Sequence, residues 1–387
     1  MTQALGSIDI ATGALLGFDP APAPLPRTAL APRAALERAI RPALQRGPCM
    51  VSFSGGRDSS AVLAVATALA RREGLALPIP VTNVFPASAE ADEACWQESV
   101  VSHLGLPDWV RLEHGDELDV VGPYARRLLS AHGLLLPCNV HFHLPILDAA
   151  AGGSLLTGIG GDELFSAARA PRSLLVGRRR GLPRRLAARA GARAPRALRR
   201  AVKGRRLSYD FPWLTAPARR ALAREVAAAA VHEPRRLWPR LAFWRSLRYV
   251  NAGCIGLDLA ASQTDTLLVH PLLDHHVWAA TGALAAPRGF SSRSDAMARL
   301  FGDLLPAPTI SRPSKASFDE AMWTATARAF AHSWDGRGVP REWVDVDALR
   351  DHWHGERPCA QTFTLLQSAW LAGAVDRVQE GVDGVLV

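Results

Sequence analysis

The residues best suited to chemistry lie in the stretch Ser54-Gly-Gly-Arg-Asp-Ser-Ser60. An apolar run, 49–53, precedes this stretch, and an alanine- and leucine-rich segment with helical periodicity, 60–72, follows it. This order predicts a strand, a tight glycine turn and a helix. The free N–H groups and the positive end of the dipole at the start of such a helix form an anion site, and phosphate is its usual occupant.

This first turn is therefore expected to bind the phosphates of a nucleotide. Its glycines permit close approach of the backbone, and its serine hydroxyls lie beside the start of the helix. The carboxylate of Asp58 would repel a bare phosphate, so its presence favours a bridging Mg²⁺. A glycine-serine turn without a ligand is the alternative, which the full string disfavours. The expected nucleotide contacts are Ser52, Ser54, Gly55, Gly56, Asp58, Ser59 and Ser60.

A second glycine-rich turn, Gly158-Ile-Gly-Gly-Asp-Glu163, follows the short apolar segment 154–157. The carboxyl ends of parallel strands meet at one edge of a sheet, so we expect Asp162 and Glu163 at the same edge as Asp58, and we take both as candidate catalytic residues. Mg²⁺ usually binds one or two carboxylates together with phosphate oxygens, which favours a metal site at Asp58 and Asp162. An N-cap role for Asp162 is the alternative. The expected nucleotide contacts of this turn are Gly158, Gly160 and Gly161.

Strand-like and helical segments alternate around these turns, which predicts an α/β fold: a parallel sheet with helices on both faces. We expect four parts along the chain. Residues 1–33 should form a short hairpin (Ser7 to Ile10 with Leu15 to Phe18) and a proline-rich linker. An α/β core at 34–168 follows, then a basic mobile segment at 169–206, and finally a mostly helical part at 207–387. The expected strands are 49–53, 80–85, 110–113 and 154–157, and the expected helices are 34–46, 60–72, 89–104, 120–132 and 144–151.

The charge and composition of the 387 residues narrow the class of protein. The formal net charge is +9, and no acidic residue appears between Glu163 and Asp210. This basic segment lacks interleaved aromatic residues for base stacking, which favours an acidic peptide partner, or none, over nucleic acid. No apolar run reaches about 18 residues, no signal peptide is evident and the five cysteines form no paired motif. We therefore expect a cytoplasmic protein with reduced thiols and no membrane span.

Four stretches in order resemble the asparagine synthetase family of ATP pyrophosphatases, over about residues 35–380. The resemblance implies that ATP is cleaved between its α- and β-phosphates and that a carboxylate is joined to an amine through an acyl-adenylate. It implies that Asp58 and Asp162 bind Mg²⁺, and that Lys315 stabilises charge on the reacting acyl-adenylate. The stretches are Ser54-Gly-Gly-Arg-Asp-Ser-Ser60, Gly158-Ile-Gly-Gly-Asp-Glu163, His270-Pro-Leu-Leu-Asp274 and Arg312-Pro-Ser-Lys-Ala-Ser-Phe318.

Two departures from the family pattern bear on the nitrogen source. The chain begins Met1-Thr2, whereas glutamine-dependent members begin with Met-Cys, so we expect this chain not to release ammonia from glutamine. Asparagine synthetases carry a glutamate at the position of Ile159, and β-lactam-forming relatives carry a tyrosine. Because an isoleucine cannot accept a proton, another group must deprotonate the amine, or the amine must arrive neutral.

Within the family, the details are most similar to the lasso-peptide macrolactam synthetases. These details are the basic segment, Pro212-Trp-Leu-Thr215 and the pattern that contains Arg312 and Lys315. That similarity implies a peptide substrate and a leader-binding or protease partner. An ammonia-dependent asparagine synthetase is the alternative. A tRNA-modifying ATP pyrophosphatase and a non-catalytic nucleotide-binding scaffold are alternatives of other classes, although thiolating tRNA enzymes need cysteine pairs that this chain lacks.

Overall fold

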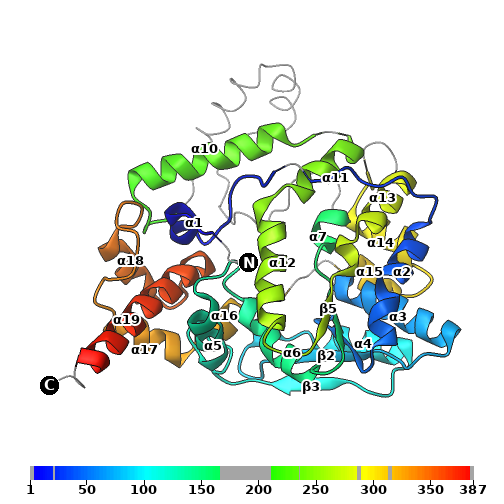
Figure 1. The fold of residues 1–387 in the computed structure, drawn as a ribbon, viewed down its shortest axis with the longest axis horizontal. Helices are drawn as coiled ribbons and strands as arrows, with labels where there is room; N and C mark the ends of the chain where they lie inside the picture. Colours follow the sequence, from blue (N-terminus) through cyan, green and yellow to red (C-terminus); the bar gives the residue numbers. More distant parts are fainter. Residues whose placement is uncertain are drawn as a thin grey trace.

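The computed structural model of the chain describes residues 4–20, 22–165, 211–234, 236–285, 289–312 and 316–383 (Figure 1). The basic segment 169–206 and Lys315 lie outside the described residues. The described part is built around one sheet of five parallel strands, in the order β3-β2-β1-β4-β5. These are β1 (Cys49–Ser52), β2 (Ile79–Val84), β3 (Val110–Glu113), β4 (Ser154–Leu156) and β5 (Leu267–Val269).

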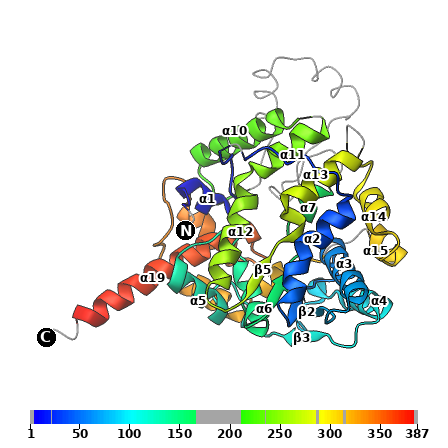
Figure 2. The same cartoon turned by 45° about the vertical axis from the view of Figure 1, so that its right-hand side comes forward.

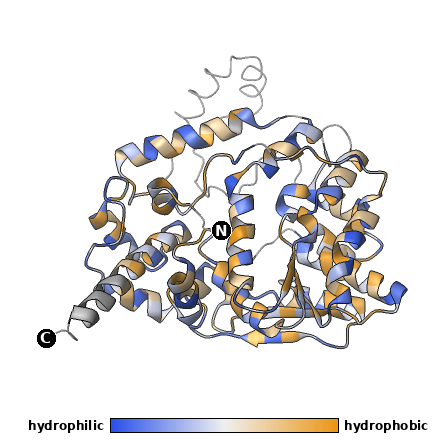
Figure 3. Cartoon of the chain, in the orientation of Figure 1, coloured by the Kyte–Doolittle hydropathy of each residue, from blue (hydrophilic) through white to orange (hydrophobic). Residues whose placement is uncertain are grey.

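Apolar side chains project from both faces of this sheet, and helices cover both faces. Val51 and Leu156 pack in one cluster with α2 (Pro32–Gln45), α3 (Arg57–Glu73) and α4 (Ala94–Leu104). On the opposite face, Met50, Val81 and Leu155 pack with α5 (Pro123–His132), α6 (Leu144–Ala149) and α12 (Arg248–Ala261). The strand arrows near the centre of Figure 3 are accordingly coloured mainly as hydrophobic. The prediction of a parallel sheet with helices on both faces is confirmed.

A second group of helices lies beside this core, with α12 between the two regions in both ribbon views (Figures 1 and 2). Its apolar cluster includes the buried Trp213, Trp323 and Trp353. These tryptophans fill the space between helices, as the helical spacing of the carboxyl-terminal half predicts. The helices of this group are α1 (Ser7–Thr12), α10 (Ala216–His232), α16 (Asp319–Met322), α17 (Ala325–Ser333), α18 (Val346–Trp353) and α19 (Phe363–Asp383).

The remaining helices complete the side of the core that carries the first turn. They are α7 (Gly161–Leu164), α11 (Leu237–Arg245), α13 (His275–Leu284), α14 (Arg293–Phe301) and α15 (Ala307–Ser311). Short 3₁₀ turns connect several elements: Ala89–Ala91, Val140–His143, Pro271–Leu273 and Ala360–Thr362. Among the described residues, no helix combines the length and apolar character that a membrane crossing requires.

The prediction of a hairpin at the amino terminus is wrong, because Ser7–Thr12 forms the helix α1. The Asp9 carboxylate accepts the Gly6 N–H at 2.9 Å, and Gly13 ends the helix in the left-handed conformation with φ +60°. An alternation of apolar and polar residues over only four positions does not distinguish one helical turn from a strand. Trp213 then binds the helix from the far half of the chain, donating its indole N–H to Ala11 O at 3.0 Å.

Three further differences concern the starts of two helices and one strand that was not predicted. Helix α4 begins at Ala94 rather than at 89, so Glu90, Asp92 and Glu93 precede it instead of forming its first turn. The sequence analysis also missed β5, a strand of three residues inside a helical region. Its place in the sheet is fixed by pairing with β4, where Leu155 lies opposite Leu268. The helix predicted at 120–132 begins only at Pro123. Proline is favoured at the first position of a helix, because the N–H that it lacks would have no partner within the helix.

Asp119 joins the α/β core to the helical group. It is fully buried, and one of its carboxylate oxygens accepts the Thr324 N–H at 2.8 Å, the Thr324 hydroxyl at 2.6 Å and the Ala327 N–H at 3.0 Å. The other oxygen accepts the Val121 N–H at 2.9 Å. Asp119 therefore caps α17 across a separation of 205 residues.

We expect Asp119→Asn to lower the thermal midpoint by several degrees, which corresponds to about 2–3 kcal/mol of lost stability. An amide oxygen can replace only one of the two acceptor groups, and its NH₂ would face N–H donors. Asp116→Asn, three residues earlier and exposed, is the matched control and should leave the midpoint unchanged. Equal midpoints for the two variants would contradict a joining role for Asp119.

Candidate active site

The first turn connects β1 to α3 at the carboxyl edge of the sheet. Gly55 has φ +75°, a conformation that favours glycine, and a Cβ at this position would lie 2.8 Å from Gln97 Cγ. Gly56 is the N-cap of α3, so Asp58 lies in the first helical turn rather than in a loop. The Ser54 and Ser59 hydroxyls lie 3.3 Å apart, and Ser59 donates to Gly56 O at 3.2 Å. The N–H groups at the start of α3 are thus presented at the strand ends.

Not every residue expected at this turn lies where a nucleotide could contact it. Ser60 is fully buried within α3, and Ser52 is the last residue of β1, paired with Val81. Ser54 is the exposed serine of the turn and Ser52 is partly exposed, whereas Ser59 is buried, as Ser60 is.

The second turn follows β4, the strand next to β1, and two glycines bring it against the first turn. A Cβ at Gly158 would lie 2.7 Å from the Ser59 nitrogen, and a Cβ at Gly161 would collide with the Asp58 carboxyl group. Gly160 has φ +96° and closes the turn into α7. Residues larger than glycine at 158 or 161 would push the two turns apart.

Asp58 and Asp162 meet at this contact and share one cation. The Arg293 guanidinium, at the first residue of α14, bonds to Asp58 through one terminal nitrogen and to Asp162 through the other. Burial by itself would lower the pKa of Arg293, but the two carboxylates outweigh it and raise that pKa above its ordinary value. The sequence analysis predicted the carboxylate pair and missed Arg293. The sequence contains one sign of this role: Arg293 begins a helix, where the helix dipole disfavours a positive charge that has no nearby anion.

Glu163, the neighbour of Asp162, bonds to α12 rather than to Arg293. Its side chain is buried, and the Tyr249 hydroxyl donates to Glu163 Oε1 at 2.6 Å. Burial raises the pKa of Glu163, and the hydrogen bond from Tyr249 partly opposes the shift. This contact ties the second turn to α12, so Glu163 supports the position of its neighbour Asp162.

Two more arginines flank the first turn. Arg57 donates to the Ser294 hydroxyl on α14 at 3.2 Å, and burial lowers its pKa, with a further contribution from the positive charge of Arg293. Arg312 is buried, donates to Gly55 O at 3.0 Å and pairs with the buried Glu93. The guanidinium groups of Arg57, Arg293 and Arg312 therefore lie at the first turn together with three carboxylates, those of Asp58, Asp162 and Glu93.

The stretch predicted to carry a catalytic lysine is held at both of its described ends, by the first turn on one side and by the 3₁₀ turn Ala89–Ala91 on the other. Arg312 binds Gly55, and on the far side the Ser317 N–H donates to Glu90 O at 3.2 Å. Phe318 packs against Phe85, with ring centroids 5.8 Å apart. Lys315 itself lies outside the described residues.

Ile159 supplies no group that could accept a proton from the amine. Ile159 packs against the apolar cluster on the α6 and α12 face. Thr157 precedes Ile159 by two residues, and its Oγ1 lies 2.7 Å from Nδ1 of His270, the residue that follows β5. Burial lowers the pKa of both His270 and His143 to about 4, so both imidazoles are neutral at pH 7.

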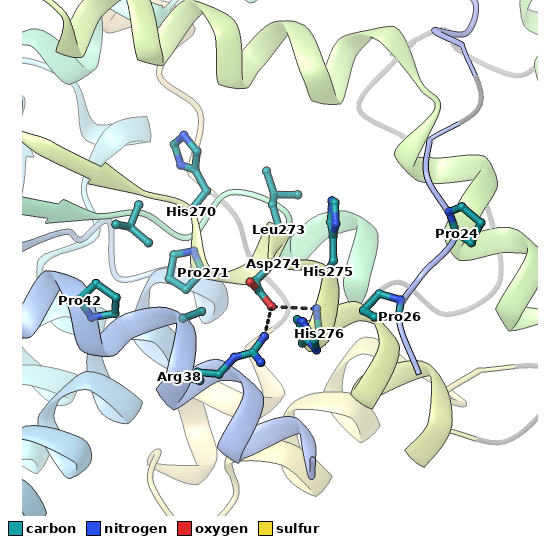
Figure 4. Close-up of a pocket in the computed structure, with 12 residues that line it drawn as sticks. Pro24, Pro26, Arg38, Pro42, His270, Pro271, Leu273, Asp274, His275 and His276 are labelled. Atoms are coloured by element: carbon teal, nitrogen blue, oxygen red, sulfur yellow. Dashed lines mark hydrogen bonds and ion pairs between the residues drawn. The ribbon is translucent and has the colours of Figure 1, made fainter. Parts of the chain in front are cut away.

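A pocket of about 720 Å³ adjoins this edge (Figure 4). Leu273 lines the pocket and also touches the second turn, since a Cβ added at Gly160 would meet the Leu273 side chain. Asp274 caps α13 by accepting the His276 N–H at 2.8 Å and lies 3.7 Å from Arg38. The other lining residues are Pro24, Pro26, Ala39, Pro42, Val269, His270, Pro271, His275 and His276.

The carboxylate pair is the arrangement best suited to a metal in the described part of the chain. No group of three or more His, Cys, Asp or Glu side chains placed to hold a metal occurs among the described residues. The buried His141 lies between two backbone carbonyl oxygens, each 3.0 Å from one of its ring nitrogens. Asp58 and Asp162 already share a cation, and two carboxylates completed by phosphate oxygens are a usual Mg²⁺ set. The residues therefore fit a Mg²⁺ ion that binds together with ATP phosphates.

Comparison with known proteins agrees with this arrangement. The family model described as Asparagine synthase matches residues 31–372, which include both glycine turns, α14 and the stretch around Arg312. Among curated proteins, no relative matches the chain.

We expect Gly161→Ala to weaken ATP binding by about tenfold or more while the protein remains folded. The added methyl group would displace the Asp58 carboxyl group from Asp162, and overpacking of this kind commonly costs about 1–3 kcal/mol. Equilibrium dialysis with ATP and Mg²⁺ measures the effect. Gly253→Ala, on α12, is the matched control, because the nearest atom to its new Cβ would be 3.9 Å away. Equal ATP affinity in both variants would contradict the claim that nucleotide binding depends on the contact between the two turns.

Proposed function

The chain belongs to the asparagine synthase family, and we propose that it forms an amide by activating a carboxylate with ATP and passing the acyl group to an amine. The observation that carries this proposal is the meeting of Asp58 and Asp162 at one cation, at the start of α3. Helix N–H groups, arginines and paired carboxylates at the ends of adjacent strands together suit a metal-bound triphosphate.

In the proposed reaction, a substrate carboxylate oxygen attacks the α-phosphorus of ATP, and the bond to the β-phosphate oxygen breaks. The N–H groups of the first turn and Arg57 bind the departing pyrophosphate. Asp58 and Asp162 would hold Mg²⁺, which neutralises phosphate charge when bound. The amine then attacks the acyl carbon, AMP leaves and the amine loses its proton. Preorganised donors that face the developing negative charge supply most of the rate enhancement.

We assign the remaining predicted residues as follows. Lys315 contacts the acyl-adenylate, in line with the anchoring of its stretch beside Gly55. Glu163 acts through Asp162, since its hydrogen bond with Tyr249 fixes the second turn against α12. Glu163 is thus a positioning residue in this proposal.

The substrate is proposed to be a peptide whose amino terminus is joined to an acidic side chain, as in macrolactam formation. The similarity of the basic segment, of Pro212-Trp-Leu-Thr215 and of the pattern with Arg312 and Lys315 to the macrolactam synthetases supports this choice. A leader-binding or protease partner would deliver such a peptide. Synthesis of asparagine from aspartate and ammonia is the second candidate, and the departure at Ile159 weighs against it.

Product analysis tests the reaction. The purified protein, ATP, Mg²⁺ and a panel of peptides with an acidic side chain should yield AMP, pyrophosphate and a product lighter by one water. Asp58→Asn should lose Mg²⁺-dependent ATP binding at least tenfold while the protein remains folded by circular dichroism, since a neutral amide is a poor ligand for Mg²⁺. The exposed Asp108→Asn is the control. Formation of ADP, or unchanged ATP affinity in Asp58→Asn, would contradict the proposal.

A second prediction concerns the chemical step. Lys315→Ala should bind ATP nearly as well as the wild type, yet form amide about 100- to 1,000-fold more slowly, because the ammonium acts on charge that develops in the transition state. Lys315→Arg should not restore the rate, since a planar fork does not replace a compact point charge. Single-turnover kinetics measure both variants. An alanine variant within about threefold of the wild type would remove Lys315 from the reaction.

A further inference from the structure

We propose that Arg293 and the divalent cation compete for the same carboxylate pair, and that nucleotide binding transfers the Arg293 guanidinium from the carboxylates to the phosphates. This inference rests on the proposed function, because it assigns the ion exchange to the ATP site. It makes Arg293 a binding residue that alternates between two partners.

The geometry of the contact shows why the pair needs a cation. Gly158 and Gly161 let the two turns touch, which brings the carboxylates of Asp58 and Asp162 together. Two neighbouring carboxylates repel each other. The Arg293 guanidinium offsets this repulsion, because its two terminal nitrogens bond to one carboxylate each. The Arg293 side chain is 23% exposed, so solvent screens the contact only in part.

The same geometry makes the two cations exclude each other. Mg²⁺ binds carboxylate oxygens at about 2.0–2.1 Å. An ion bound to both Asp58 and Asp162 would lie where the Arg293 nitrogens lie, and the two positive charges would repel strongly in this half-buried setting. Arg293 must therefore release the pair when the metal binds.

The place of Arg293 in α14 indicates where its guanidinium goes. Ser292 caps the helix by accepting the Asp295 N–H at 3.0 Å, and the Asp295 carboxylate accepts the Ser291 N–H at 2.9 Å. The backbone is thus fixed, and only the side chain needs to move. The next residue, Ser294, accepts a hydrogen bond from Arg57 in the first turn of α3. A released Arg293 guanidinium accordingly stays beside the phosphate turn.

Phosphate is the natural second partner for this guanidinium. Arginine binds phosphate oxygens through two parallel hydrogen bonds, as it binds carboxylates. A cation at the first position of a helix opposes the helix dipole, so this position is favourable only next to anions. The divalent ion also adds two positive charges to the site, which suits a triphosphate.

Binding of Mn²⁺ without nucleotide is the most direct test. We expect Arg293→Gln to bind Mn²⁺ about tenfold or more tightly than the wild type, measured as loss of free Mn²⁺ in electron paramagnetic resonance titrations. Its thermal midpoint in EDTA should fall, because the carboxylates lose their counter-ion. The same variant should gain less affinity for ATP in the presence of Mn²⁺ than it gains for Mn²⁺ alone, because the ATP phosphates lose the Arg293 guanidinium as a binding partner.

Arg299→Gln is the matched control on the same helix. Arg299 stacks over the Phe290 ring at 5.6 Å, and its loss should leave Mn²⁺ affinity unchanged. Unchanged or weaker Mn²⁺ binding in Arg293→Gln would overturn the inference. If that variant does not fold, Arg293→Lys replaces it: a point charge that cannot span both carboxylates should also tighten Mn²⁺ binding, by a smaller factor, and no change would overturn the inference.

The outcome is separable from that of the proposed function. Tighter Mn²⁺ binding in a protein that forms no AMP would support the exchange and contradict amide synthesis. AMP formation by a protein whose Mn²⁺ affinity does not respond to Arg293 would support amide synthesis and overturn the exchange.

Discussion

Two carboxylates from neighbouring strand ends share one guanidinium, and much of the structure is organised to permit that contact. Strands β1 and β4 are adjacent and parallel, so their turns leave the sheet at the same edge. Glycines at 158 and 161 let the turns touch. The N-terminus of α3 faces the same point, and α14 supplies the cation. An anion-binding helix start and a carboxylate pair are thereby placed where a metal bound to phosphate can satisfy both.

The helical half of the chain completes this edge. Arg312 binds the first turn at Gly55, Tyr249 of α12 holds Glu163 of the second turn, and Asp119 fastens α17 to the core. Each of these contacts buries a polar or charged group with a partner, so loss of one partner would leave the other without compensation. Helix α12 and the segment after α15 thus hold the two glycine turns in place, while Asp119 joins the helical group to the core.

The sequence predicts the parts of this design that rest on local patterns. Strand–turn–helix periodicity identified four of the five strands and the two turns, and parallel topology implied that Asp58 and Asp162 lie together. Arg293 was missed because its role depends on contact with residues more than 130 positions away. Strand β5 was missed because three residues carry too little periodicity. The amino-terminal helix was mistaken for a hairpin because its short alternation suits either structure.

The most direct measurement of the account is a crystal structure with Mn²⁺ and a non-hydrolysable ATP analogue, α,β-methylene ATP, collected for anomalous scattering. The account predicts a manganese peak bound to both Asp58 and Asp162, phosphates at the start of α3 and the Arg293 guanidinium turned from the carboxylates to the phosphates. A nucleotide bound elsewhere, with Arg293 still joined to both carboxylates, would contradict it.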